Sequence, residues 1–267
     1  MKGRLSMAPL VYVALLMTPV YWLVAMSFKT NAEIGGGLTF YPHSISLENY
    51  ALILTDPDWY MGYVNAIIYV VINVVISVSV ALPAAYAFSR HDFFGHRALF
   101  FGLLMFRMMA PAILLAPFVQ IFSDLGLIDT HIAVAIAHCF FNVPLAIWIL
   151  EGFISAIPRE MDESARIDGH GVVSFMRRIL IPQIAPGIAV AAFFCFMFSW
   201  IEYMLANALT TVDAKPIAGI MTRAAGVMTG DIALLSAASV LGLLPGLLLI
   251  IFVRKHLATG FSMGRVI

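Results

Sequence analysis

Six long apolar stretches separated by shorter polar segments dominate the pattern of this chain. Each is long enough to cross ~30 Å of hydrocarbon at about 20 residues per helix. Because every backbone amide in lipid needs a protein partner, we expect helices rather than strands, and the alternation typical of a barrel is absent. The sequence therefore predicts an all-α integral membrane protein, whose six expected spans are roughly Pro9–Phe28, Tyr63–Ser89, Ala98–Phe122, Ile132–Leu150, Gln183–Ala206 and Ile232–Val253.

The polar segment from Ser155 to Pro182 lies between the fourth and fifth spans and must remain outside the lipid. Ser155 can cap a helix, and Pro158 suits a first helical turn, where its missing amide hydrogen would be unpaired in any case. Gly169 tolerates the left-handed conformation that ends a helix. The segment therefore predicts a short surface helix that stops at Gly169.

The composition of this helix favours a protein partner over a membrane surface. Two oppositely charged pairs at i, i+4 spacing, Arg159/Glu163 and Asp162/Arg166, each support a helix by a few tenths of a kcal/mol. A plain helix lying along the headgroups is the alternative, but such helices carry bulky apolar residues and many lysines. The small apolar face and the acidic residues here fit a protein groove better.

Composition supports the membrane assignment. The 267 residues are 62% hydrophobic and only 11% charged, with a mean hydropathy of +0.96. A soluble domain carries roughly 25% charged residues. The net charge is zero and no basic run is present, so nucleic acid is not an expected partner.

The distribution of positive charge predicts the orientation of the spans. With both termini inside, eleven of the fifteen Lys and Arg residues lie in inner segments. Lys29, Lys215 and Arg223 lie in outer segments, and Arg107 lies within a span. This bias indicates an N-in, C-in topology.

Several kinds of chemistry are not indicated. Cys139 and Cys195 lie in apolar runs with no metal or redox spacing, so we expect small buried residues there. The seven histidines form no HExxH motif and are expected in loops or at interfaces. No GxxxxGK[ST] motif occurs, so the chain is not expected to bind ATP through a P-loop.

Charged residues inside the spans are the candidates for a translocation path. A charge in mid-bilayer costs roughly 2.5–3.5 kcal/mol, so it usually faces a cavity or a partner. Arg107 and Glu202 are expected either to pair directly, or to lie apart with Arg107 on backbone carbonyls and Glu202 near the outer interface. Asn142 and Trp200 could offer neutral polar and aromatic contacts to a polyol, although packing between helices is the stronger expectation for Asn142.

The polar segment carries a recognisable motif. Glu163-Ser164-Ala165, then Asp168-Gly169, then Ile179-x-Ile181-Pro182, resembles the Glu-Ala-Ala-x-x-x-Gly…Ile-x-Leu-Pro signature of the integral-membrane permease subunits of binding-protein-dependent ABC importers. Ser164 replaces an Ala and Ile181 replaces a Leu, and His170 stands where Ala is common.

The resemblance extends along nearly the whole chain. Together its segments are similar to the carbohydrate-uptake branch, and within it to the maltose-type second permease subunit. They are Tyr86–Gly95, Leu125–Thr130, the Ser199-Trp200-Ile201-Glu202 run, with Ile201 where the family has Asn, and the tail Gly260–Gly264.

The resemblance implies a function and its partners. The chain would be one permease domain, residues 1–267, in a bacterial or archaeal inner membrane. Its coupling helix, with Glu163, Ser164, Ala165, Asp168, Gly169 and Pro182, would dock on separate ATPases. The implied partners are a second homologous permease, two cytoplasmic ABC ATPases and an extracytoplasmic solute-binding protein. ATP and Mg would be used by the ATPases, and this chain would bind no cofactor.

The transported solute would then be a carbohydrate or polyol, such as a sugar, a sugar alcohol, glycerol or glycerol phosphate. The alternative from another class is a self-contained secondary transporter or channel, because prolines interrupt several spans. No paired halves are evident in the sequence, however. A non-transport scaffold would leave Arg107 and Glu202 without a purpose.

Overall fold

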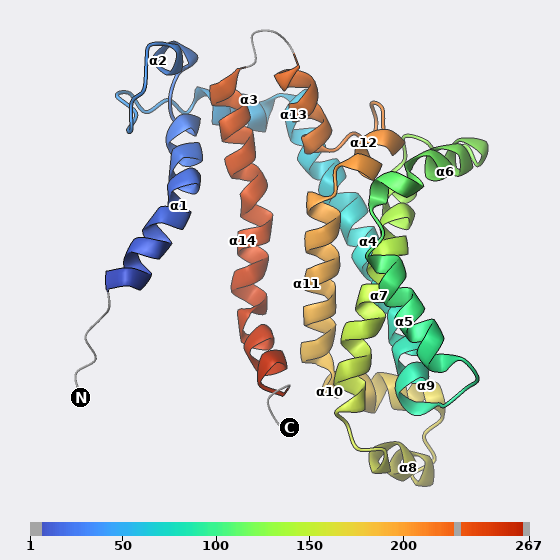
Figure 1. Cartoon of the computed structure of the whole chain (residues 1–267). Helices are drawn as coiled ribbons and strands as arrows, with labels where there is room; N and C mark the ends of the chain where they lie inside the picture. The colour runs from blue at the N-terminus through green and yellow to red at the C-terminus, as the bar shows by residue number, and fades with distance from the viewer. Residues whose placement is uncertain (1–6, 227–230, 264–267) are drawn as a thin grey trace, which may run out of the picture. The chain divides into compact units, whose positions relative to one another are not determined.

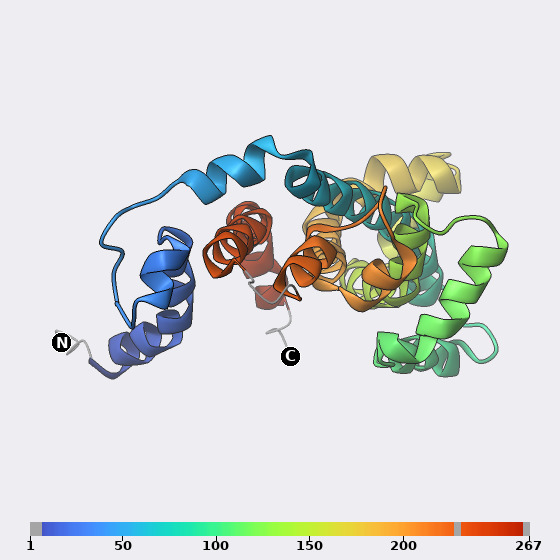
Figure 2. The same cartoon turned by 90° about the horizontal axis from the view of Figure 1, so that it is seen from above.

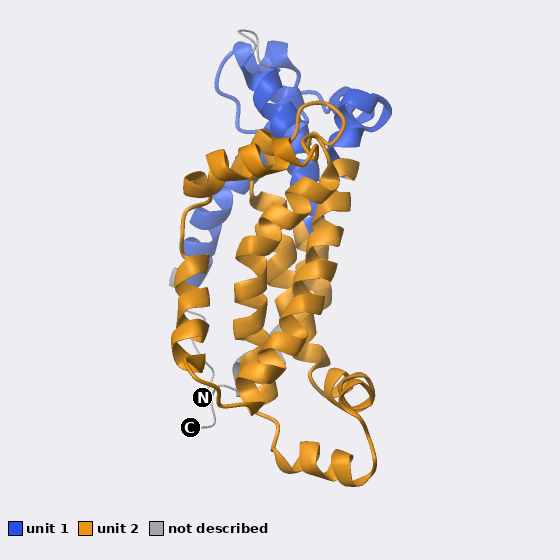
Figure 3. Cartoon of the chain, turned by 90° about the vertical axis from the view of Figure 1, so that its right-hand side faces the viewer, with its two compact units in different colours: residues 1–63, 217–245 blue, residues 64–216, 246–267 orange. Residues whose placement is uncertain are grey.

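The computed structural model describes residues 7–226 and 231–263, with side chains through Arg254 except that of Ala8. In these ranges the chain is helical and contains no strand. Four helices are long and apolar enough to cross a membrane, or six if each of two bent helix pairs is one span. The chain divides into two compact units, residues 1–63 with 217–245 and residues 64–216 with 246–267 (Figure 3).

Within the described residues, the first unit contains the three amino-terminal helices, one later helix, and parts of two further helices. Its apolar core includes Ile53, Trp59 and Ile217. The hydroxyl of Tyr63 donates to the carbonyl of Ala238, 2.7 Å away. The helices that lie wholly in this unit are α1 (Met7–Ser27), α2 (Asn31–Gly35), α3 (Glu48–Thr55) and α13 (Ile217–Ala225), while α4 (Pro57–Arg90) and α14 (Ile232–Met263) contribute residues to both units.

The second unit is built around α7 (His131–Ser155), which packs against α5, α11 and α12 and is hydrogen-bonded to α4. Small residues such as Ala133, Ala137 and Ala146 are buried on it and allow close helix approach. Figures 1 and 2 show this helix beside α11. The other helices of the unit are α5 (His96–Arg107), α6 (Pro111–Asp124), α8 (Glu160–Ile167), α9 (Val172–Phe175), the π-helix η1 (Met176–Leu180), α10 (Ile181–Gln183), α11 (Ala185–Ile201) and α12 (Met204–Leu209).

The stretch Ala98–Phe122, expected as one helix, is broken. Helices α5 and α6 meet at 92°. The break occurs because Ala110, just before Pro111, has an extended backbone (φ −67°, ψ 131°). A residue preceding proline is driven out of the helical region by the proline ring. Sequence length therefore predicted the apolar stretch but not its geometry.

The stretch Gln183–Ala206 also departs from a single helix. The segment Val172–Gln183 meets α11 at 81°. At the other end, α11 stops at Ile201, because Glu202 is extended (ψ 118°), and α12 begins two residues later. The remaining expected spans are continuous helices. Two of them extend past both predicted bounds, α4 (Pro57–Arg90) and α7 (His131–Ser155), whereas α1 ends at Ser27, one residue before the predicted end.

Candidate functional site

Helix α8 lies within the predicted segment but begins later than expected, at Glu160 after Arg159. Ser155, expected as its cap, is instead the last residue of α7, and Pro158 precedes α8. The acidic residues Glu160, Asp162 and Glu163 occupy its first turn, where the helix dipole favours negative charge. At its end, Gly169 adopts φ +81°. The amide of His170 donates to Ala165 O (2.9 Å), and the amide of Gly169 donates to Arg166 O (3.0 Å). These bonds make a Schellman motif, which confirms Gly169 as the stop.

The two faces of α8 differ. Asp162 and Ala165 are buried, with 9% and 3% of their surface exposed. The other residues singled out from the motif, Glu163, Ser164, Asp168, Gly169 and Pro182, are exposed. The helix therefore uses one face to attach to its own unit and leaves the motif face open.

Asp162 pairs with α4 rather than with Arg166. Its carboxylate accepts from Arg90 Nε at 2.9 Å and Nη2 at 3.4 Å, and from the hydroxyl of Tyr86 at 3.1 Å. Side-chain exposure is only 6% for Arg90 and 11% for Asp162. The expected i, i+4 pair within α8 is thus replaced by a long-range pair. We call Tyr86, Arg90 and Asp162 the α4–α8 clamp.

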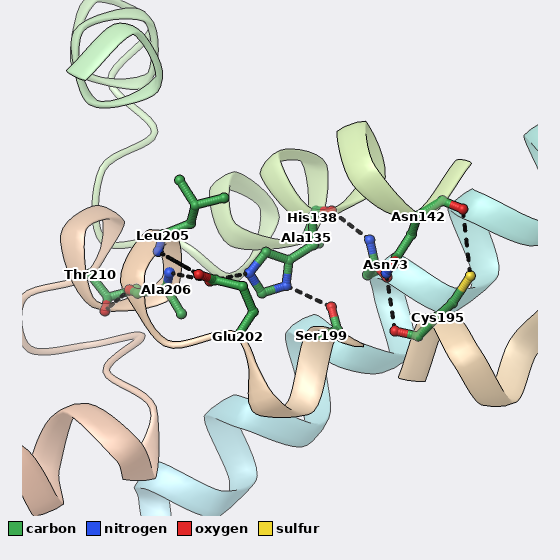
Figure 4. Close-up of polar contacts among 10 residues, drawn as sticks. All are labelled: Asn73, Ala135, His138, Asn142, Cys195, Ser199, Glu202, Leu205, Ala206 and Thr210. Carbon is green, nitrogen blue, oxygen red and sulfur yellow. Dashed lines mark hydrogen bonds and ion pairs between the residues drawn. The ribbon is translucent and has the colours of Figure 1, made fainter. Parts of the chain in front are cut away.

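A second buried polar group lies at the break between α11 and α12. Nε2 of His138 lies 3.0 Å from Glu202 Oε2, and Nδ1 lies 2.6 Å from Ser199 Oγ. The carboxylate also accepts from the amides of Leu205 (3.1 Å) and Ala206 (3.3 Å) (Figure 4). It therefore caps α12 while joining α7 to α11. We call His138, Ser199 and Glu202 the α7–α11 cluster.

His138 contradicts the expectation that the histidines lie in loops or at interfaces, because it is fully buried in α7. The ring of Tyr69 on α4 stands edge-on to it at 5.6 Å. Two sequence signals could have identified this group: a histidine inside an otherwise apolar span, and a Ser199–Glu202 spacing that places both side chains on one helix face.

Asn142 belongs to a neighbouring network of packing contacts. Its Nδ2 donates to Asn73 Oδ1 (2.6 Å) and to Cys195 O (3.0 Å), and Asn73 in turn donates to Ala135 O (3.0 Å). Cys139 and Cys195 are buried and free, as expected. The Oδ1 of Asn142 is buried without a hydrogen-bond partner. The network ties α4, α7 and α11 together.

Arg107 does not pair with Glu202, so the direct pair, one of the two arrangements expected, is wrong. Its guanidinium carbon lies 4.4 Å from the ring centroid of Phe198, in cation–π contact, and its Nε has no hydrogen-bond partner. Trp200 stacks on Phe196 with ring centroids 5.9 Å apart. The structure therefore places Arg107 at the α5–α6 bend and Glu202 with His138, and the ring of Phe198 lies against both Arg107 and His138.

An apolar pocket of about 270 Å³ opens among α4, α11 and α14 in the second unit. It presents no polar surface, so it lacks the hydrogen-bonding groups that a sugar would require. Its lining comprises Val71, Val74, Val75, Ala189, Ala192, Phe193, Phe196, Leu249 and Val253.

Asp129, in the loop before α7, organises another loop of the same unit. Its carboxylate accepts from the hydroxyl of Thr211 and from the four amides of residues 211–214, at 2.6–3.1 Å. Partial burial raises the pKa of this carboxyl, but the hydrogen bonds outweigh it and hold the pKa below its usual value. No local pattern in the sequence indicates this role.

Comparison with known proteins identifies a family. A model of binding-protein-dependent transport system inner membrane components matches residues 79–262. The diacetylchitobiose uptake permease DasC of Streptomyces coelicolor is 27% identical over 254 residues, covering 94% of this chain and 92% of DasC. The trehalose transport permease SugB of Mycobacterium tuberculosis is 27% identical, with the same two coverages. The trehalose/maltose permease MalG of Thermococcus litoralis is 28% identical, covering 92% and 90%.

Solved structures share the fold. A chain of a bacterial ABC transporter that imports the acidic polysaccharide alginate matches with a TM-score of 0.78 and 23% identity, covering 92% of each chain. A chain of the MetNI methionine ABC transporter matches with a TM-score of 0.58 and 16% identity, covering 80% of this chain and 98% of that one.

Proposed function

This chain belongs to the family of binding-protein-dependent transport system inner membrane components, and we propose that it is the permease subunit through which an ATP-driven importer moves a carbohydrate or polyol into the cell. Sugar-transport permeases similar along nearly its whole length support that solute class. The solute would be a sugar, a sugar alcohol, glycerol or glycerol phosphate, and it would cross by alternating access.

The observation that carries the proposal is the two-faced geometry of α8. One face is fixed to the chain's own helices through Asp162 and Ala165. The open face bears the motif residues proposed to contact an ATPase, namely Glu163, Ser164, Asp168 and Gly169, while Ala165 packs beneath them and Pro182 leads toward α11. A helix fixed on one side and open on the other suits the transmission of movement from a partner.

In the proposed topology, α5 and α6 together form one span and α11 forms another, while Val172–Gln183 stays at the inner surface, which gives six spans with both termini inside. The excess of Lys and Arg in the segments then assigned to the inside supports this orientation. It places α8 in the cytoplasm and the loop held by Asp129 outside. We infer that residues 1–267 act as one permease domain, because α4 and α14 contribute to both compact units.

The proposed transporter contains a second homologous permease, two cytoplasmic ABC ATPases and an extracytoplasmic solute-binding protein, in the inner membrane. A solved bacterial alginate ABC transporter of similar fold is in complex with an alginate-bound periplasmic protein, which supports a partner of that kind. ATP and Mg would be used on the ATPases, since this sequence contains no P-loop motif, and the chain itself would carry no cofactor.

Of the four residues proposed for the translocation path, two would line it and two would hold the surrounding helices in place. Arg107 and Trp200 would line it, since a guanidinium carries donors for solute oxygens and an indole offers an aromatic face. Asn142 and Glu202 are engaged in contacts between helices. They would shape the path rather than touch the solute.

Gly169→Leu tests the coupling assignment. A side chain at φ +81° is strained, and the altered turn would displace the motif face. We expect the variant to insert and assemble with the second permease, but to lose most ATP-driven uptake in proteoliposomes. Radiolabelled trehalose, maltose, diacetylchitobiose and glycerol would serve as solutes, and ATPase association would be measured by affinity purification.

Gly152→Leu is a matched control, because a Cβ added at Gly152 would meet no other atom within 4 Å and this glycine has no positive φ. Normal uptake by Gly169→Leu would remove the coupling assignment. If the parent chain purified without any P-loop ATPase, as an assembly of itself alone, the secondary transporter or channel would replace the proposed function.

A further inference from the structure

The last turn of α4 is bound to the α7–α8 region at more than one point. Besides holding Asp162, Arg90 donates through Nη2 to Ile157 O at 3.0 Å. Arg159 donates back to Ser89 O at 3.3 Å, and the hydroxyls of Ser89 and Ser155 lie 2.8 Å apart. These contacts join residues about 70 positions apart in the chain, so they fix tertiary arrangement rather than helix formation.

Packing supports the same attachment. Ala165 of α8, Ala85 of α4 and Phe175 of α9 belong to one buried apolar cluster. The ring of Tyr86 lies 5.9 Å from that of Phe175. The hydroxyl of Tyr86 donates to Asp162, so the carboxylate accepts from two residues, Tyr86 and Arg90, that lie one helix turn apart on α4.

A nearly buried ion pair is informative because it is costly to form. Removing two charges from water requires good geometry and additional hydrogen bonds in return, and an apolar pair of similar volume is often as stable. Here Arg90 uses two nitrogens on the carboxylate and a third contact on a carbonyl. Such a pair specifies the position of one element on another better than apolar packing would.

We propose that the α4–α8 clamp makes α8 and the end of α4 move as one body, so that displacement of α8 by an ATPase is delivered directly to α4. This inference rests on the proposed function. Within α4, Asn73 is bonded to α7 and Asn142, so movement of α4 reaches the buried network of the bundle. Arg90 and Asp162 are therefore positioning residues that act away from the exposed motif face.

The test measures whether the two elements stay together during the ATP cycle. Spin labels are attached to cysteines introduced at Val80 on α4 and Glu160 on α8, both exposed. The two native cysteines are buried and so poorly accessible to the label. In the reconstituted transporter, we expect the distance between labels to be the same without nucleotide and with ATP and vanadate.

Asp162→Asn should allow α8 to move independently of the end of α4. It keeps the size of the side chain but removes its charge, and we expect the labels to shift by about 3 Å, two residues of helical rise, on nucleotide trapping. Uptake of the panel solute that the parent transports should fall about tenfold, with ATP hydrolysis within about twofold. Asp92→Asn, an exposed charge removal two residues beyond Arg90, should change neither measurement.

A label distance that stays constant in Asp162→Asn, or one that changes in the parent, would overturn the clamp. Loss of ATPase association in Asp162→Asn would also overturn it, by making Asp162 a docking residue. If Asp162→Asn fails to assemble, Arg90→Lys, which keeps the charge but not the two-nitrogen contact, is measured in its place with the same expected results. Failure of the parent to bind any ATPase would instead reject the proposed function.

Discussion

The α4–α8 clamp and the α7–α11 cluster are both buried acid–base pairs, yet their carboxylates serve different groups. Asp162 receives side-chain donors only, from Tyr86 and Arg90. Glu202 receives one side-chain contact, from His138, and backbone amides at the start of α12. The carboxylate of Asp162 joins α8 to α4. The carboxylate of Glu202 joins α11 to α7 and also stabilises the break between α11 and α12.

This difference shows that a buried carboxylate can either position one helix on another or stabilise the end of a helix. Breaking a side-chain pair frees two elements to move apart while each stays folded. Removing a carboxylate that caps a helix leaves buried amides without partners, and each costs about 1–3 kcal/mol. We therefore expect the clamp to control coupling and the cluster to control stability.

The largest expected effect is that of Glu202→Ala. It leaves the α12 amides and Nε2 of His138 without their partner, so we expect a loss of about 3 kcal/mol in the free energy of unfolding. Thermal unfolding of the purified transporter in detergent would show this as a lowered Tm.

Asp162→Asn, measured beside it, should lose less stability while uncoupling uptake from ATP hydrolysis. If Asp162→Asn proved the more destabilising of the two and Glu202→Ala the more uncoupled, the roles assigned to the two pairs would be reversed.

A middle-sized effect is expected for His138→Phe. The aromatic shape remains, but Glu202 loses its side-chain partner and keeps its backbone donors. We expect a loss of about 1–2 kcal/mol in unfolding free energy. His96→Phe, at the start of α5, is a control with little expected change, and a loss equal to that of Glu202→Ala would mean that the backbone contacts contribute nothing.

The smallest effect is expected for Asp129→Asn. Like that of Glu202, the carboxylate of Asp129 accepts from backbone amides, but it lies in a loop. Asparagine tolerates the positive φ of 62° at this position. Since the site is largely solvated, we expect a loss of only about 1 kcal/mol at neutral pH.

The pH dependence follows from the lowered pKa of Asp129. Its contribution is fully present above the ordinary pKa of 3.8 and is lost as the pH falls through the lower value of the folded state. The Tm difference between the parent and Asp129→Asn should therefore be constant from pH 7 to pH 5 and shrink below pH 4. A difference that grew on acidification would contradict this account.

Much of the chain was predictable from local sequence. The presence of a helix before Gly169 and its stop at that residue were predicted because a helix terminus depends on neighbours within one or two turns, although the start at Glu160 was not. The apolar stretches were predicted because hydrocarbon length sets a minimum run of residues. The burial of Cys139 and Cys195 followed from the same apolar pattern.

The partners of the charged residues were not predictable. Asp162 lies at helical spacing from Arg166 but pairs with Arg90, and Glu202 pairs with His138 instead of Arg107. Likewise, the bend at Ala110 shows that a proline within an apolar run leaves open whether the helix continues. The tail motif at residues 260–264 lies where the structure describes no side chains.

The sequence by itself determined that the chain is helical, spans a membrane and carries a polar helix that stops at Gly169, because these depend on composition and on neighbours within a few residues. Only the tertiary structure decided which buried charges meet and which face of α8 stays open. Those contacts join residues 64 and 72 positions apart, and their geometry depends on how the helices pack, which no local spacing records.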